Sequence, residues 1–348
     1  MLTYLQAVVI GLLQGVTELF PVSSLGHSVL VPAVIGGSWQ HLVTQSSTES
    51  SETSPYLAFI VALHVATAVA LLVFFRQDWF RIIRAFFRSL GPSLRARRIV
   101  AEDGHERLAW LIVIGTIPVG LTGVALEHTF RTLFAKPLAA AIFLTVNGMV
   151  LLAGEWLRRR APVHEDELEE ASPADAAHIG EDGSAAARPA EAGAVLGREV
   201  AAQPPPRVAI QSRSEARRQR SRRLGTLHYG EALVIGLFQT LALLAGISRS
   251  GVAMVGGLVR GLSHRDAARF SFLLATPVIL AAGVLKVPSL AGPAGNGIHG
   301  QVLVGALAAG LAAYASVRWL TRYFETRTLT PFAIYCLAAG IFCIVRFA

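Results

Sequence analysis

The chain has 348 residues, of which 53% are hydrophobic and only 16% are charged. Together with a mean hydropathy of +0.51, this composition excludes an ordinary soluble domain and is typical of a polytopic membrane protein. The net charge of +8 raises nucleic-acid binding as an alternative. Aromatic and basic residues do not interleave on a soluble face, however, so we expect no nucleic-acid partner.

Two apolar segments, residues 6–36 and 230–263, are interrupted by glycine, proline and serine and then resume. We expect these interruptions at Pro21, Gly26, Gly246 and Gly251. Each apolar arm is too short to span a bilayer comfortably, and non-helical backbone at membrane depth needs surrounding protein or a wet cavity. The pattern predicts two re-entrant helix–loop–helix hairpins whose tips point inward. A pair of kinked spanning helices is the alternative.

Six other stretches are apolar over roughly 20 residues, the length that a spanning helix requires. They cover residues 57–76, 108–126, 138–157, 268–287, 300–320 and 329–347. His64 is the notable polar residue in the first stretch. We expect it to be a packing residue rather than a ligand.

The two interrupted segments resemble each other in sequence. A shift of 225 residues aligns identical residues at Val9, Ile10, Gly11, Leu12, Gln14, Ser23 and Gly26. A duplicated apolar segment that ends in a Ser/Gly turn predicts an all-α membrane protein built from two repeats of inverted topology. We expect the first repeat at residues 1–158 and the second at 229–348, each with one hairpin and three spanning helices.

The distribution of arginine predicts the orientation of the chain in the membrane. The connections at residues 77–107, at 158–228 and near 325 are rich in arginine, so we expect them in the cytoplasm. Residues 37–56 contain no Lys or Arg, which predicts an external loop. The loops near 127–137 and 288–299 then lie outside as well.

Residues 159–228 form a polar insertion that opens with acidic residues and closes with arginines. Low hydrophobicity and segregated charge predict a disordered cytoplasmic segment. Its basic end could lie on anionic lipid headgroups. We favour a tolerated linker over a regulatory element.

Glu18 is the sharpest indication of chemistry, because a carboxylate inside an apolar segment is costly unless it is paired, hydrated or bound to a metal. Gln14 lies four residues earlier and therefore on the same helical face. A buried hydrogen-bonded pair that holds helices together is the structural alternative. We prefer function, because Ser23, Ser24 and His27 follow directly.

Both interruptions carry groups that suit a phosphate. Ser23 or Ser24 could cap a helix that begins near Gly26, and the free N–H groups of that helix start would favour an anion. In the second interruption, Arg249 has the planar donor fork that matches a phosphate. The flanking groups Ser248, Ser250 and Gly251 would add contacts. The alternative is a salt bridge from Arg249 to Glu18.

The motifs resemble the two signature regions of the undecaprenyl-diphosphate phosphatase family, the bacitracin-resistance type. They are Gln14-xxx-Glu18, Pro21-Val22-Ser23-Ser24-Leu25-Gly26-His27, Gly246-x-Ser248-Arg249-Ser250-Gly251 and Arg269-Phe270-Ser271-Phe272-Leu273-Leu274-Ala275-Thr276-Pro277. The resemblance covers the chain except residues 159–228. The chain departs from the family pattern at three positions, where the family often has Glu, usually has Pro and often has Thr: Gln14, Ala245 and Ala253, respectively.

This resemblance implies six spanning helices and two re-entrant hairpins in the cytoplasmic (inner) membrane of a bacterium. It implies hydrolysis of undecaprenyl diphosphate to undecaprenyl phosphate and inorganic phosphate, which recycles the lipid carrier for cell-wall synthesis and confers bacitracin resistance. A divalent cation, Mg²⁺ or Ca²⁺, assists, and the active site opens to the external, periplasmic side. The resemblance leaves open whether the protein forms a homodimer.

We therefore expect metal-assisted cleavage in which Arg249, Ser23, Ser248, Ser250 and Gly251 bind the diphosphate. Glu18, with Gln14, binds the metal or acts as general base. Ser24 is the preferred nucleophile, with His27 as acid/base or phosphate ligand. Attack by His27 or by activated water remains open. The alternative function is a lipid-phosphate transporter or flippase that uses the same pocket without cleavage.

Overall fold

The computed structural model describes residues 2–48, 54–125, 136–160, 224–286, 288, 290, 292 and 295–348. Throughout these ranges the regular structure is helical, and they contain no strand. The predicted all-α class is therefore confirmed. The predicted insertion at residues 159–228 lies outside the described residues except at its two ends.

Six helices of the described chain are long and apolar enough to cross a membrane, as predicted. They are α4 (Pro55–Phe74), α6 (Gly104–Ala125), α8 (Pro137–Arg160), α12 (His264–Lys286), α13 (His299–Tyr323) and α14 (Thr330–Phe347). Each covers one of the apolar stretches, because a run of about 20 apolar residues satisfies its backbone hydrogen bonds in lipid only as a helix. The chain is a multi-pass membrane protein.

Each interrupted segment folds into two short helices separated by a loop. In the first segment these are α1 (Tyr4–Thr17) and α2 (Ser24–Ile35), and in the second α10 (Tyr229–Thr240) and α11 (Arg249–Val259). We call residues 18–23 the first loop and residues 241–248, which include a short 3₁₀ turn, the second loop.

The expected interruptions are right for Pro21 and Gly246 but wrong for Gly26 and Gly251. The latter two lie inside the first turns of α2 and α11. Both helices begin earlier than expected because serine hydroxyls cap them. The Ser23 hydroxyl accepts the Gly26 N–H, and the Ser248 hydroxyl accepts the Gly251 N–H.

Two connections that sequence analysis treats as loops contain helices. Residues 77–107 include most of α5 (Arg76–Ala96), and residues 37–56 include α3 (Gly37–Thr48). Helix α5 is amphipathic, with Ile82, Ala85 and other buried residues on one face and arginines on another. Its arginines lower its mean hydropathy below that of a spanning helix. Sequence analysis therefore interprets the connection as a basic loop.

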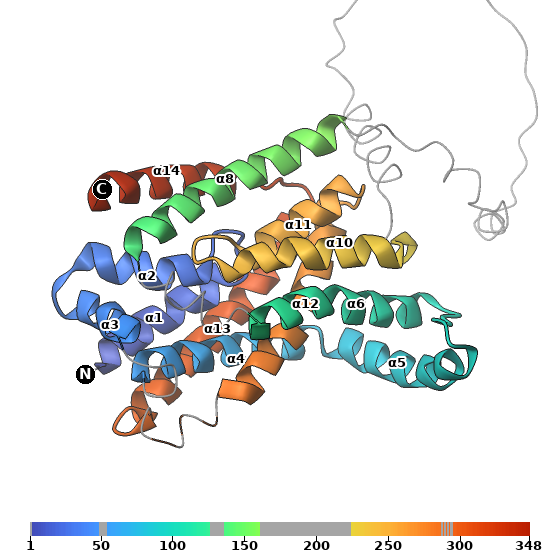
Figure 1. Cartoon of the computed structure of the whole chain (residues 1–348), viewed down its shortest axis with the longest axis horizontal. Coiled ribbons are helices and arrows are strands. Elements are labelled where there is room, and N and C mark those ends of the chain that lie inside the picture. The colour runs from blue at the N-terminus through green and yellow to red at the C-terminus, as the bar shows by residue number, and fades with distance from the viewer. Residues whose placement is uncertain are drawn as a thin grey trace, which may run out of the picture. The chain divides into compact units, whose positions relative to one another are not determined.

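The short helices pack across the chain in a matching way. Helix α1 lies along α13, and α10 lies along α6 (Figure 1). The two crossings are close because each has glycine on both sides. A Cβ added to Gly11 would lie 2.3 Å from the carbonyl oxygen of Gly305, and one added to Gly236 would lie 2.4 Å from that of Gly115. These approaches tolerate no side chain.

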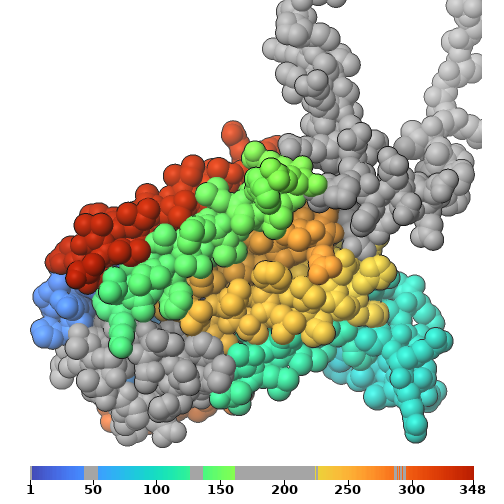
Figure 2. Space-filling model, turned by 45° about the horizontal axis from the view of Figure 1, so that its top comes forward, coloured from blue at the N-terminus to red at the C-terminus, as the bar shows by residue number. Residues whose placement is uncertain are grey.

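Helix α8 positions the two loops. It packs along α14 and also contacts α2 and α11, the helices that follow the two loops. Figure 2 shows this face, with α8 (green) between α14 (red) and the helices α10 and α11 (yellow to orange). The first and second loops therefore meet beside the middle of α8.

Candidate active site

The first and second loops are joined directly. Besides capping α2, the Ser23 hydroxyl accepts a hydrogen bond from the Gly246 backbone N–H at 3.1 Å. A Cβ on Gly26 would lie 2.9 Å from the Gly246 Cα, so only glycine allows this approach. Ser23 itself has a φ of 72°, a conformation that non-glycine residues rarely adopt. The Ser23 hydroxyl oxygen thus accepts one backbone N–H from α2 and one from the second loop.

Ser248, Ser250 and Gly251 also lie where the loops meet. The Ser248 and Ser250 hydroxyl oxygens are 3.0 Å apart, and the Ser250 hydroxyl donates to the Phe20 carbonyl at 3.3 Å. A Cβ on Gly251 would lie 3.3 Å from the Pro21 side chain. The motif residues of the second segment are therefore in contact with the first loop, although more than 200 positions separate them in sequence.

Glu18 is the centre of the site. Its side chain is buried, and the Gln14 amide donates to its Oε2 atom at 3.0 Å. The Ser24 hydroxyl donates to the same oxygen. Arg249 forms an ion pair with the other oxygen, Oε1. The salt bridge that sequence analysis weighed as an alternative for Arg249 is present, and it places the guanidinium beside Ser24.

His64 also belongs to this cluster, so the expectation that it only packs is wrong. Its Nε2 atom lies 3.3 Å from Oε2 of Glu18. Its Nδ1 atom lies 2.8 Å from the Ile60 carbonyl oxygen, one turn earlier in α4. Because a carbonyl can only accept, Nδ1 carries a proton and Nε2 is the atom that faces the carboxylate.

His27 lies near Ser24 in sequence but faces away from its hydroxyl. The Nδ1 atom of His27 donates to the Ser23 carbonyl at 2.7 Å, and its Nε2 atom lies 2.7 Å from the Tyr335 hydroxyl. With Nδ1 protonated, Nε2 is the acceptor for Tyr335 in the neutral ring. No hydrogen bond joins the His27 ring to the Ser24 side chain, both of which are described.

The donors around Glu18 suit a hard divalent cation. The Gln14 Oε1 atom is buried and has no hydrogen-bond partner among the described residues. An unpaired amide oxygen beside a carboxylate is the kind of oxygen set that Mg²⁺ and Ca²⁺ prefer. The described residues contain no group of three His, Cys, Asp or Glu side chains placed to hold a metal ion. The expected ligands to a cation, Gln14 and Glu18, therefore stay a prediction.

Sequence reasoning missed two residues of the site, Asn147 and Tyr335, and noticed a third, His64, but assigned it to packing. Asn147 is fully buried in α8 and hydrogen-bonds to both loops. Each lies within a stretch recognised as a spanning helix, where a lone polar residue is unusual. That signal was visible in the sequence, but it does not name the partner of a polar side chain.

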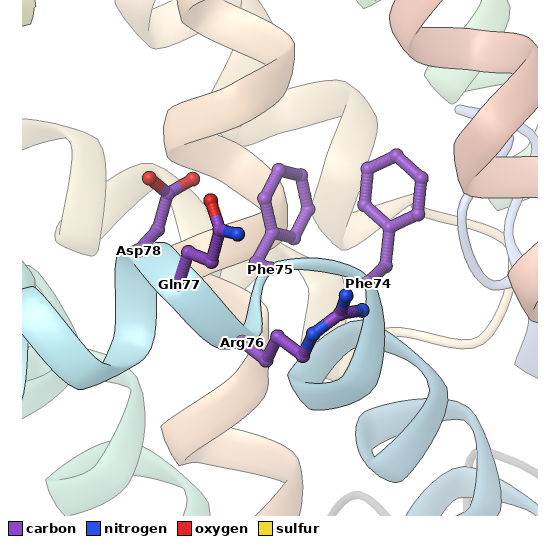
Figure 3. A pocket seen from close by; sticks show the side chains of 5 residues that line it. All are labelled: Phe74, Phe75, Arg76, Gln77 and Asp78. Carbon is purple, nitrogen blue, oxygen red and sulfur yellow. The ribbon is translucent and has the colours of Figure 1, made fainter.

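A pocket of about 270 Å³ lies elsewhere, at the junction of α4 and α5. Figure 3 shows its lining residues, which are Phe74, Phe75, Arg76, Gln77 and Asp78. Asp78 pairs with Arg269 of α12 at 2.9 Å. None of the predicted site residues lines this pocket.

The geometry around Glu18 can activate a hydroxyl next to an anion-binding group. The Ser24 hydroxyl already donates to a carboxylate that can take its proton. Arg249 lies on the other side of that carboxylate, with the Ser248 hydroxyl one residue before it. A partly buried guanidinium and neighbouring hydroxyls suit a phosphoryl group, whose transfer depends on positioning and charge neutralisation.

Comparisons with known proteins find a matching family and several similar proteins. Residues 7–190 and 207–342 match the family described as Bacitracin resistance protein BacA. The chain is 65% identical to Undecaprenyl-diphosphatase 2 of Frankia alni, over 100% of this chain and 98% of that protein. It is 55% identical to an Undecaprenyl-diphosphatase of Mycolicibacterium paratuberculosis, over 97% of this chain and 95% of the relative. Undecaprenyl-diphosphatase 1 of Frankia casuarinae is 51% identical over 99% and 98% of the two chains.

Proposed function

This chain belongs to the bacitracin resistance protein family, and we propose that it hydrolyses undecaprenyl diphosphate to undecaprenyl phosphate and inorganic phosphate. The reaction recycles the lipid carrier for cell-wall synthesis and confers resistance to bacitracin. The observation that carries the proposal is the arrangement at Glu18, whose carboxylate accepts the Ser24 hydroxyl and pairs with Arg249. A nucleophile, a base and a phosphate ligand are thus in contact.

Ser24 is the nucleophile in this mechanism. Its oxygen attacks the terminal phosphorus while Glu18 takes the hydroxyl proton, and the bond from that phosphorus to the bridging oxygen breaks. Undecaprenyl phosphate leaves with the electron pair. Water then attacks the phosphoserine, the Ser24 oxygen leaves phosphorus and takes back the proton held by Glu18, and inorganic phosphate is released. Arg249 turns from Glu18 to the terminal phosphate, where the hydroxyls of Ser248 and Ser250 add contacts.

His27 is a less suitable nucleophile in this geometry. Its Nε2 atom is engaged by the Tyr335 hydroxyl at 2.7 Å, and its Nδ1 atom is engaged by the Ser23 carbonyl. The ring would have to leave Tyr335 before it could attack phosphorus. In our mechanism His27 serves instead as a phosphate ligand or proton donor, a role that it takes up after its Nε2 atom has left the Tyr335 hydroxyl. The Ser23 hydroxyl accepts two backbone N–H groups, and its own O–H donates to the diphosphate in our mechanism.

A divalent cation, Mg²⁺ or Ca²⁺, is part of the proposal. Gln14 and Glu18 would hold it, and the unpartnered Gln14 Oε1 atom supports that assignment. When bound, the cation supplies positive charge against the diphosphate oxygens. The residues of the chain do the rest: Arg249 orients the terminal phosphate, and Glu18 holds the proton of Ser24.

The membrane placement follows the same proposal. Residues 1–158 and 229–348 form two repeats of inverted topology, each opening with a re-entrant hairpin, and residues 159–228 are a cytoplasmic insertion. The matched glycine contacts of Gly11 and Gly236 support this relation between the repeats. The protein lies in the bacterial cytoplasmic membrane with its active site open to the periplasm, and a homodimer is compatible with the fold.

Phosphate release from undecaprenyl diphosphate by the purified protein tests the function. The assay is run in detergent with Mg²⁺, with Ca²⁺ and with EDTA, and Ser24→Ala and His27→Ala are assayed in parallel. We expect cation-dependent release that Ser24→Ala abolishes and His27→Ala only reduces. Folded wild-type protein that binds the lipid diphosphate without releasing phosphate contradicts the proposal and favours a transporter. Inactivation by His27→Ala with an active Ser24→Ala reverses the nucleophile assignment.

A further inference from the structure

Asn147 is the one side chain of α8 that hydrogen-bonds to both loops in the described part of the chain. It lies in the middle of an apolar spanning helix and its exposed fraction is 0%. Its Nδ2 atom donates to the Pro21 carbonyl of the first loop at 3.0 Å, and its Oδ1 atom accepts the Ser248 N–H of the second loop at 2.9 Å. Both ends of the amide are thereby used.

The two backbone groups that Asn147 satisfies have no helical partner. Pro21 lies between α1 and α2, and Ser248 is the residue before α11, so neither group belongs to a helix ladder. A buried backbone group that has no hydrogen-bond partner destabilises the fold. Cys336 of α14 adds a weak contact, with its Sγ atom 3.8 Å from the Pro21 oxygen. Asn147 is therefore the main group holding these two loop positions together.

The positions of these contacts matter for the site. Pro21 lies between Glu18 and Ser24 in the first loop, and Ser248 directly precedes Arg249. The base and nucleophile thus lie at the two ends of the first loop, and the phosphate ligand directly follows the second loop. A shift between the loops would move Arg249 relative to Ser24 without unfolding either helix.

We propose that Asn147 is a positioning residue that holds the two loops in register, so that a phosphate bound by Arg249 lies in line with Ser24. This inference rests on the proposed function for its kinetic consequence, but its structural part is independent of catalysis. It predicts an effect on turnover rather than on binding, because Arg249 and the Ser248 hydroxyl remain available when the amide is removed. A misplacement of about 1 Å between reacting groups costs about 100-fold in rate.

The test compares two variants of the full chain that each carry one substitution, Asn147→Ala and Thr145→Ala. Thr145 is a matched control from the same helix, since its hydroxyl bonds to the Ala141 carbonyl of α8 and to neither loop. Hydrogen–deuterium exchange is followed in peptides covering residues 18–26 and 244–252. We expect Asn147→Ala to speed exchange in both peptides and to lower kcat about 100-fold with KM changed less than threefold. Thr145→Ala should change neither.

Each outcome has a distinct meaning. Unchanged exchange in both peptides of Asn147→Ala overturns the inference, as does a normal kcat per folded molecule. A fall in activity that only follows the folded fraction assigns Asn147 a structural role and also overturns it. If the wild type releases no phosphate but the exchange of both peptides still depends on Asn147, the proposed function fails and the loop register stands.

Discussion

Two clusters in the described part of this chain each contain a buried glutamate, a histidine and an arginine. We call them the loop cluster (Glu18, His64 and Arg249) and the helix-end cluster (Glu155, His264 and Arg158). The residue types are the same, and both glutamates are buried. They differ in how the partners are arranged and in whether their surroundings are fully hydrogen-bonded.

The helix-end cluster is a chain of hydrogen bonds. Arg158 donates to Nδ1 of His264 at 2.8 Å, so the Nε2–H of that ring donates to Glu155 at 2.6 Å. The Leu329 N–H donates to the same Glu155 oxygen at 2.7 Å. These bonds tie α8 to the start of α12 and to the connection before α14. Such an arrangement stabilises a fold, and none of the three residues has a buried side-chain atom without a hydrogen-bond partner among the described residues.

In the loop cluster, by contrast, the partners converge on one carboxylate. His64 and Arg249 face Glu18 directly, a serine hydroxyl donates to it, and the neighbouring Gln14 Oε1 atom has no partner among the described residues. The three residues come from different elements: Glu18 lies in the first loop, Arg249 begins α11 and His64 lies in α4. The comparison teaches that an incompletely satisfied, convergent cluster marks the site better than the presence of buried charge does.

We expect the largest difference in activity between the two clusters when their arginines are substituted. Arg249→Lys keeps the charge but removes the planar fork that binds a phosphate, so kcat/KM should fall about 100-fold. Arg158→Lys should leave kcat/KM within twofold of wild type. Steady-state hydrolysis of undecaprenyl diphosphate measures both. Equal losses in the two variants would mean that Arg249 acts through the fold.

The histidine of the helix-end cluster should matter for stability instead. His264→Gln weakens a buried hydrogen bond to a charged group, and we expect a loss of about 2 kcal/mol in the free energy of unfolding. Thermal unfolding in detergent gives the change in Tm. Activity per folded molecule should remain that of the wild type, and a fall in it would place the helix-end cluster in the catalytic machinery.

A smaller effect on activity is expected from the histidine of the loop cluster. His64→Gln removes the ring that faces Glu18 while keeping a polar side chain, so Glu18 is held less firmly. We expect kcat/KM to fall about 10-fold, the value of one hydrogen bond to a charged group. The measurement is the same hydrolysis assay, with His264→Gln as the comparison. If His64→Gln has the kinetics of the wild type, His64 only packs and does not contribute to catalysis.

Much of this site could be predicted from sequence, because its residues cluster locally. The four-residue spacing of Gln14 and Glu18, and Ser24 shortly after them, indicated one polar face leading into a turn. The six spanning helices were predictable as well, since lipid requires long apolar runs. The second interruption, which contains Arg249, could be identified because its sequence resembles that of the first.

The remaining features depend on contacts between distant parts of the chain. Nothing near His64 or Asn147 in sequence says that these side chains face Glu18 or the loops, since their partners lie on other elements. The orientation of His27 away from Ser24 follows from Tyr335, which lies 308 residues later. Helix α5 was missed for another reason, because its arginines mask an amphipathic pattern.

One measurement tests the contrast most directly: the initial rate of phosphate release from undecaprenyl diphosphate by Glu18→Gln and by Glu155→Gln, each normalised to folded protein. The two substitutions are the same in chemistry and both fall on buried glutamates. We predict a rate about 1,000-fold below wild type for Glu18→Gln, because the base is lost. For Glu155→Gln we predict a rate within twofold of wild type. Substantial activity in Glu18→Gln, or equal loss in both, would contradict the assignment of the active site to the loop cluster.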